Sequence, residues 1–187
     1  MKFKKVIAVL TILICISIMM SGCSIFPNMN LDDEDNEEAT IQEPSLDDDQ
    51  KGKVEYAIKH YFYGMQNADL NYFLSAFPNF MHDNYNQQML DKVLENFEQT
   101  YGKSIHISYE LLTQKEVEPE EIETMQKFIE SMYDSQEKIT AGYIIGLTAT
   151  IEGDKSSDTD ELEFYVFEIN GDWYYLEETP ESAAYYL

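Results

Sequence analysis

The stretch KITAGYIIGLTATIE, residues 138–152, decides the fold class of this chain. Alternate positions from Ile139 to Ile151 are apolar, and the positions between them are mostly Thr and Gly. A period of two is typical of a β-strand whose two faces meet different surroundings. The small residues of the second face allow a helix, or the curvature of the sheet itself, to come close. The stretch therefore predicts a long strand in a curved sheet.

The residues that follow this strand predict an antiparallel meander. The polar run 153–160 suits a hairpin loop, and Leu162–Ile169 is expected to be a strand with apolar residues on both faces. Asn170-Gly171 favours a two-residue type I′ turn, so Trp173–Glu177 is expected to return as the last strand. Residues 179–187 are expected to form a loose tail.

Helical spacing dominates the residues before the sheet. Apolar residues recur at helical spacing from Val54 to Met65, which predicts the first core helix. Asp69 is a good N-cap for a second, shorter helix. A third helix is expected to end near Thr100, with Gly102 just beyond it.

One strand and one more helix complete the predicted domain. Apolar and polar residues alternate from Ile105 to Leu111, which indicates a strand. Pro119 and the glutamates after it suit the start of a fourth helix, whose narrow apolar stripe indicates a position on the surface. Residues 51–178 are thus expected to form one α+β domain, with N-terminal helices packed on a curved antiparallel sheet.

The N-terminal residues have the pattern of a secretion signal. Lys2, Lys4 and Lys5 precede an uncharged run, Val6–Met20, which is shorter than the roughly 20 residues that span a bilayer. Ser21-Gly22-Cys23 follows and resembles the lipobox of bacterial lipoproteins. In that family a peptidase cuts before the cysteine, which carries a diacylglycerol. The resemblance implies a signal peptide over residues 1–22, lipid attachment at Cys23 and a place on the outer face of the cell membrane. Secretion after cleavage near Gly22 and an uncleaved anchor are the alternatives.

The segment after Cys23 is expected to be a spacer. Residues 24–50 hold ten acidic residues and no basic one, so they cannot bury enough apolar surface to offset their chain entropy. With Cys23 they are expected to form a disordered acidic linker, residues 23–50. Its carboxylates lack the glycine and the ligand spacing of a calcium loop.

Composition limits the classes of partner. All twelve basic residues are lysines, and loss of the three near the N-terminus takes the formal net charge from −24 to −27. Such a surface is repelled by phosphates, so no nucleic-acid partner is expected. Cys15 would leave with the signal peptide, so no intramolecular disulfide is expected.

Two short motifs carry a resemblance to a known family. The closing hairpin Ile169–Tyr175 and the stretch from Tyr61-Phe62-Tyr63-Gly64 to Asp69 resemble segments of the NTF2-like, or cystatin-like cone, superfamily. They are similar in particular to small Gram-positive lipoproteins that carry such a domain after an acidic linker. The resemblance implies helices enclosed by a curved sheet, and it leaves function open because the superfamily holds enzymes, binding modules and dimerisation domains.

Candidate ligand-binding residues are aromatic side chains that could line an apolar pocket in the cone. Their alternative role is ordinary core packing. They are Tyr61, Phe62, Tyr109, Tyr143, Tyr165 and Trp173.

Catalysis is a second hypothesis, implied by ketosteroid-isomerase-like relatives, in which a carboxylate base and a phenol share an apolar cavity. Glu110 or Glu168 could be the base, and Tyr56 or Tyr61 the hydrogen-bond donor. No residue here matches a specific catalytic motif, so no catalytic residue is assigned. His60, His82 and His106 show no metal-ligand spacing and are expected to be surface or edge histidines, and neither a metal nor a cofactor is expected.

The sequence thus predicts a lipid-anchored, non-catalytic binding module. Its partner would be a small apolar ligand in the cone or another envelope protein on the sheet. An isomerase- or dehydratase-like enzyme and a module that forms homodimers through the sheet face are the alternatives. An enclosed cavity that holds a buried carboxylate with a shifted pKa beside a tyrosine would favour the enzyme, whereas a filled cone and an exposed apolar sheet face would favour an interaction module.

Overall fold

The computed structural model describes Ala39–Thr40 and residues 53–187, which all belong to one compact unit, residues 38–187. The signal peptide of residues 1–22, the lipid attachment at Cys23 and most of the predicted linker lie outside the described residues.

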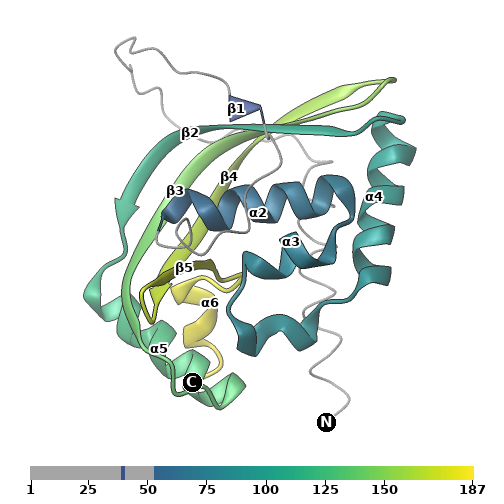
Figure 1. Cartoon of the computed structure of the whole chain (residues 1–187). Coiled ribbons are helices and arrows are strands. Elements are labelled where there is room, and N and C mark those ends of the chain that lie inside the picture. The colour runs from purple at the N-terminus through teal and green to yellow at the C-terminus, as the bar shows by residue number, and fades with distance from the viewer. Residues whose placement is uncertain (1–38, 41–52) are drawn as a thin grey trace. The chain divides into compact units, whose positions relative to one another are not determined.

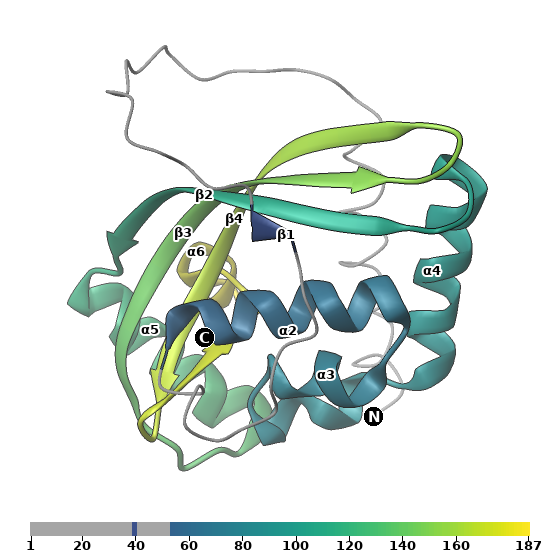
Figure 2. The same ribbon diagram turned by 45° about the horizontal axis from the view of Figure 1, so that its top comes forward.

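Antiparallel strands form one curved sheet (Figures 1 and 2). Its order, β1-β2-β3-β4-β5, follows the chain, so the sheet is a meander. The strands are β1 (Ala39–Thr40), β2 (His106–Glu116), β3 (Ile139–Glu152), β4 (Ser157–Ile169) and β5 (Asp172–Tyr175). The predicted α+β class with a curved antiparallel sheet is confirmed.

Helices flank the sheet, and α2 lies along its concave side (Figure 1). In the part of the chain that the structure describes, four helical segments come before β2, one lies between β2 and β3, and one follows β5. They are α2 (Val54–Asn67), α3 (Leu70–Ser75), the 3₁₀ helix η2 (Asn79–Asn84), α4 (Gln87–Tyr101), α5 (Pro119–Tyr133) and α6 (Pro180–Ala184).

Local chemistry fixes the contact between α2 and α3. The Asp69 carboxylate accepts hydrogen bonds from the N–H groups of Asn71 and Tyr72, at 3.0 and 3.3 Å, which confirms the predicted N-cap. A Cβ on Gly64 would lie 2.5 Å from the Phe73 nitrogen. Glycine at this position therefore allows the two helices to touch, while α2 itself continues to Asn67.

Turn geometry confirms the predicted final hairpin. Asn170 and Gly171 have positive φ angles of 56° and 95°, as a type I′ turn requires. The turn pairs Ile169 with Asp172 and, further along the hairpin, Val166 with Tyr175. This register turns Tyr175 toward the same face as Val166.

Two segments form secondary structure where none was predicted. Ala39 and Thr40, within the expected linker, pair with Tyr109 and Ser108 as strand β1. The residues expected as a loose tail contain α6, because Thr179 caps it and Pro180 is buried.

Helix α5 is more buried than its narrow apolar stripe indicated. Met125, Phe128 and Ile129 are at most 3 % exposed, because Phe128 widens the stripe on the side that packs. Glu118 and Glu121 form a capping box at the start of the helix, which supports the predicted starting point. The helix lies on the surface as predicted, with Glu123, Lys127 and Glu130 exposed, but its packed face is wider than the predicted stripe.

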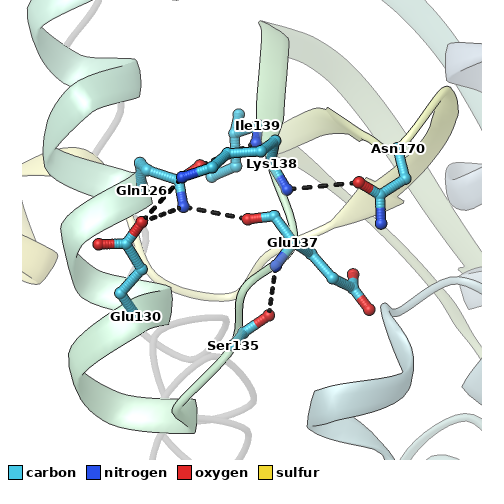
Figure 3. A network of polar contacts seen from close by, with 7 residues as sticks. All are labelled: Gln126, Glu130, Ser135, Glu137, Lys138, Ile139 and Asn170. Atoms are coloured by element: carbon cyan, nitrogen blue, oxygen red, sulfur yellow. Dashed lines mark hydrogen bonds and ion pairs between the residues drawn. The ribbon is translucent and has the colours of Figure 1, made fainter.

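A polar network joins α5 to the beginning of β3 and to the final hairpin (Figure 3). The Gln126 side chain accepts from the Ile139 N–H at 2.9 Å and donates to the Glu137 carbonyl at 3.0 Å. Its amide thereby satisfies two backbone groups as a neighbouring strand would. Asn170 also accepts from the Lys138 N–H at 3.4 Å.

Candidate functional site

The concave side of the sheet holds a cluster of aromatic side chains around Tyr61. The ring centroid of Tyr61 lies 5.2–5.5 Å from those of Phe62, Phe73, Phe164 and Tyr175. These spacings are those of packed aromatic pairs. Phe62, Phe73 and Phe164 are at most 4 % exposed. Side chains from α2, α3, β4 and β5 therefore pack together in this cluster.

Six aromatic residues were predicted to line a pocket, and the structure distributes them over three places. Tyr61, Phe62 and Tyr109 lie together, with Phe62 stacked on Tyr109 at 5.4 Å. Tyr143 and Trp173 form a separate stacked pair at 5.2 Å.

The sixth residue, Tyr165, faces the other side of the sheet. It follows Phe164, which contacts Tyr61, and successive side chains of a strand point to opposite faces. The predicted set is thus partly core and does not surround one common volume.

The carboxylates named for catalysis lie on two strands that are not neighbours. Glu110 is on β2 and Glu168 on β4, with β3 between these strands. Glu168 accepts a hydrogen bond from Thr140 Oγ1 at 2.6 Å. Tyr56, a predicted donor, is buried and stacks on His60 at 3.8 Å.

His60 is 1 % exposed, so its prediction as a surface or edge residue is wrong. Its Nδ1 makes a short hydrogen bond with Ser75 Oγ, which itself donates to the Tyr72 carbonyl at 2.6 Å. Since the hydroxyl proton is directed to that carbonyl, His60 Nδ1 is the donor to Ser75. The pair is therefore arranged for packing and not for activating a serine nucleophile.

The other two histidines make local contacts. His82 Nε2 is 3.0 Å from the Phe77 carbonyl, and His106 is a partly exposed residue of β2. In residues 39–40 and 53–187, no group of three or more His, Cys, Asp and Glu is arranged to hold a metal ion.

A group of acids and phenols lies where η2, the end of α5 and the link between β5 and α6 meet. We call Tyr85, Tyr133, Glu177 and Glu178 the carboxyl–phenol cluster. Tyr85 is 6 % exposed and packs on Phe77 with ring centroids 4.6 Å apart. Among the described residues the Tyr85 hydroxyl has no partner within ordinary hydrogen-bond geometry, but it is near enough to Glu177 for the two groups to interact.

Burial and like charge determine the protonation of this cluster. Burial, and then the neighbouring charge of Glu178, raises the pKa of Glu177 to about 8, although its contact with Tyr85 acts in the opposite direction. Burial also raises the pKa of Glu178. At pH 7 a carboxyl with a pKa near 8 is about nine-tenths protonated. Glu177 is therefore a neutral acid at neutral pH.

The two phenols respond to the same acids. Burial and then the charge of Glu177 raise the pKa of Tyr85 well above its ordinary value. Burial and then the charge of Glu178 raise the pKa of Tyr133, whose hydroxyl also accepts from Asn84 Nδ2 at 3.5 Å. The cluster thus presents neutral O–H groups that could donate to an oxygen atom.

The sequence offered only a faint sign of this cluster. Glu177-Glu178 stands between an apolar strand and Pro180, where two adjacent acids are ordinarily solvated. In the structure both acids are half-buried, and they interact with Tyr85 and Tyr133, which are far away in the chain.

Fold and site together define a small α+β protein with an aromatic cluster on the concave side of its sheet and a carboxyl–phenol cluster in which Tyr85 is buried and the other three residues are half-buried. Its described part, residues 39–40 and 53–187, contains no helix that is both long and apolar enough to cross a membrane. Comparisons of the chain with protein-family models, with curated proteins and with solved structures gave no match.

Proposed function

We propose that this protein is a non-catalytic interaction module, tethered by a lipid on Cys23 to the outer face of the cell membrane. Residues 1–22 are its signal peptide, and the acidic residues up to 50 hold the domain away from the membrane. The Lys2-to-Cys23 pattern supports this proposal, because a short apolar run that ends in small residues before a cysteine suits a lipoprotein signal. Two acyl chains would give lasting attachment where one would not.

The close packing of aromatic rings around Tyr61 is the observation that favours a protein partner over a small apolar ligand. Tyr61 has four aromatic neighbours at 5.2–5.5 Å, and packed interiors hold few voids. A ligand in the cone would have to displace buried rings such as Phe73, which is 1 % exposed. The exterior of the domain is therefore the more favourable place for binding.

An NTF2-like fold is part of the same proposal. The opening helix on the concave side of a meander and the closing type I′ hairpin support it (Figure 1). Helix α5 between β2 and β3 would be an addition to the simplest cone.

Metabolic labelling tests the tether. Cells of the source bacterium grown with labelled palmitate should incorporate the label into this polypeptide, and Cys23→Ala should abolish incorporation. An unlabelled protein, or a cytosolic one that retains residues 1–22, would refute the proposal.

A second candidate function is an enzyme that stabilises an oxyanion, and the carboxyl–phenol cluster is the observation that favours it. A neutral acid and a phenol can together donate hydrogen bonds to a developing negative charge. Glu177 and Tyr85 would take this role, which the sequence-based hypothesis gave to other residues.

Binding of substituted phenols of increasing acidity separates the two functions. An oxyanion site should bind the more acidic phenols more tightly, and Glu177→Gln and Tyr85→Phe should remove that trend. Equal, weak binding of all phenols would exclude the enzyme.

A further inference from the structure

The outer margin of β2 is only partly covered. Strand β1 pairs with Tyr109 and Ser108 and, among the described residues, is the one strand on that side. Beyond it, residues Thr113–Glu116 are exposed. We call the outer side of Thr113–Glu116 the open edge; Figure 2 shows this arrowhead end of β2 at the margin of the sheet.

Backbone direction shows which groups the open edge presents. Val117 donates its N–H to the Gly142 carbonyl of β3 at 2.9 Å, so the Val117 N–H points toward β3 and away from the open edge. Backbone groups of a strand alternate in direction, and the N–H groups of Gln114 and Glu116 consequently point outward. At the covered end, the Ile107 N–H is satisfied by Gln66 Oε1 at 2.6 Å.

We propose that the open edge binds an extended, cationic segment of a partner protein, antiparallel to β2 and in continuation of β1. This inference rests on the proposed interaction function and specifies its surface and its partner. Addition of a strand to an exposed sheet edge is a common mode of peptide recognition, and β1 shows that this margin accepts an antiparallel segment.

The negative charge at and next to the open edge favours a positively charged partner segment. Glu116 lies on the open edge, and Glu118, Glu120 and Glu121 follow it directly, against the single cation Lys115. Complementary charge favours correct encounter and disfavours wrong partners. Lysine- or arginine-rich strands are therefore favoured here.

The same charges disfavour two other occupants. An extension of β1 from Ala39 toward the N-terminus would bring Glu38 opposite Glu110, since Ala39 pairs with Tyr109. Like charges directly opposite one another destabilise a strand pair. A second copy of the chain would bring together two molecules that each carry a formal charge of −24.

Amide exchange with a defined probe tests the open edge. The probe is a peptide of alternating Lys and Val, added to the isotopically labelled full-length chain in micelles of a zwitterionic detergent and followed by NMR. We expect amide exchange to slow at least about tenfold at Gln114 and Glu116, with little change at Thr113 and Lys115, which already face β3. This alternation is the mark of strand pairing.

Matched peptides and variants separate backbone pairing from simple charge attraction. A probe with alternate amides N-methylated, and one with Glu for Lys, should both lose binding. Glu116→Lys should weaken binding about three- to tenfold at low salt, whereas Glu161→Lys, at an exposed position of β4, should not.

Three outcomes would overturn the inference. The first is equal binding of the N-methylated probe, and the second is protection spread over the acidic start of α5. The third is protection of Gln114 and Glu116 that rises with protein concentration without any probe, which would make a second copy the occupant. Palmitate labelling is independent of all three, so failure at the edge and failure of the tether are distinguishable.

Discussion

Glu177 makes the stability of this fold sensitive to pH in a defined direction. Its pKa is about 8 in the folded protein, against an ordinary value of 4.5. Between these values the folded state keeps a proton that the unfolded chain has released. Stability therefore falls as the pH rises from about 4.5 to about 8, and it levels off above that.

The shift sets an upper limit on the effect. One pKa unit corresponds to about 1.4 kcal/mol, so a shift of roughly three and a half units gives at most about 5 kcal/mol. Glu177 keeps some solvent exposure, which screens the interaction, and we expect about 2–3 kcal/mol. Glu178, whose pKa is also raised, contributes with the same sign.

Denaturant unfolding at a series of pH values measures this quantity. The free energy of unfolding of the unmodified protein should decline between pH 5 and pH 8. Glu177→Gln, which stays neutral at every pH, should remove most of the decline, whereas the exposed control Glu181→Gln should retain it. An unchanged slope in Glu177→Gln, or stability that rises with pH over this range, would refute the reasoning.

Other substitutions test the packing described above. Gly64→Ala should cost about 3 kcal/mol of unfolding free energy in denaturant titrations, because the added Cβ would meet Phe73 backbone 2.5 Å away; a loss below about 1 kcal/mol would contradict the close contact of α2 and α3. Asp69→Ala should cost about 1 kcal/mol through loss of the N-cap, and an unchanged thermal midpoint would show that the cap is dispensable. Gln126→Ala should cost about 1–3 kcal/mol and speed exchange of the Ile139 amide, since that N–H loses its acceptor; exchange at the original rate would place the acceptor elsewhere.

The elements with strong local patterns were predictable from the sequence. Alternation over residues 138–152 marked β3, Asn170-Gly171 marked the hairpin, and Asp69 marked the start of α3. Each pattern depends on neighbouring residues that impose a period or a φ angle. Local chemistry was therefore sufficient at these positions.

Elements that depend on distant contacts were not predictable. Ala39 and Thr40 have no strand pattern, and they join the sheet through backbone pairing with β2. Helix α6 follows only a short polar segment, and it is held by burial of Pro180 and Ala183. Propensity alone does not report such contacts.

The candidate site had the same limitation. Aromatic periodicity did not separate Tyr61, which is half-buried among aromatic rings on the concave side, from Tyr165 on the other face of the sheet. Burial, and then the neighbouring charge of Glu178, raises the pKa of Glu177. Its environment is formed by chain segments that no local window contains.

Under the proposed attachment of a lipid to Cys23, strand β1 would have a mechanical consequence. While Ala39 and Thr40 are paired with β2, the linker between Cys23 and residue 39 can span at most roughly 55 Å. If those two residues separated from β2, the linker would join the domain at about residue 53, and its maximum length would rise to roughly 100 Å. The domain could thus lie at two different maximum distances from the bilayer, and a pulling force that separates β1 from β2 would switch it from the shorter to the longer.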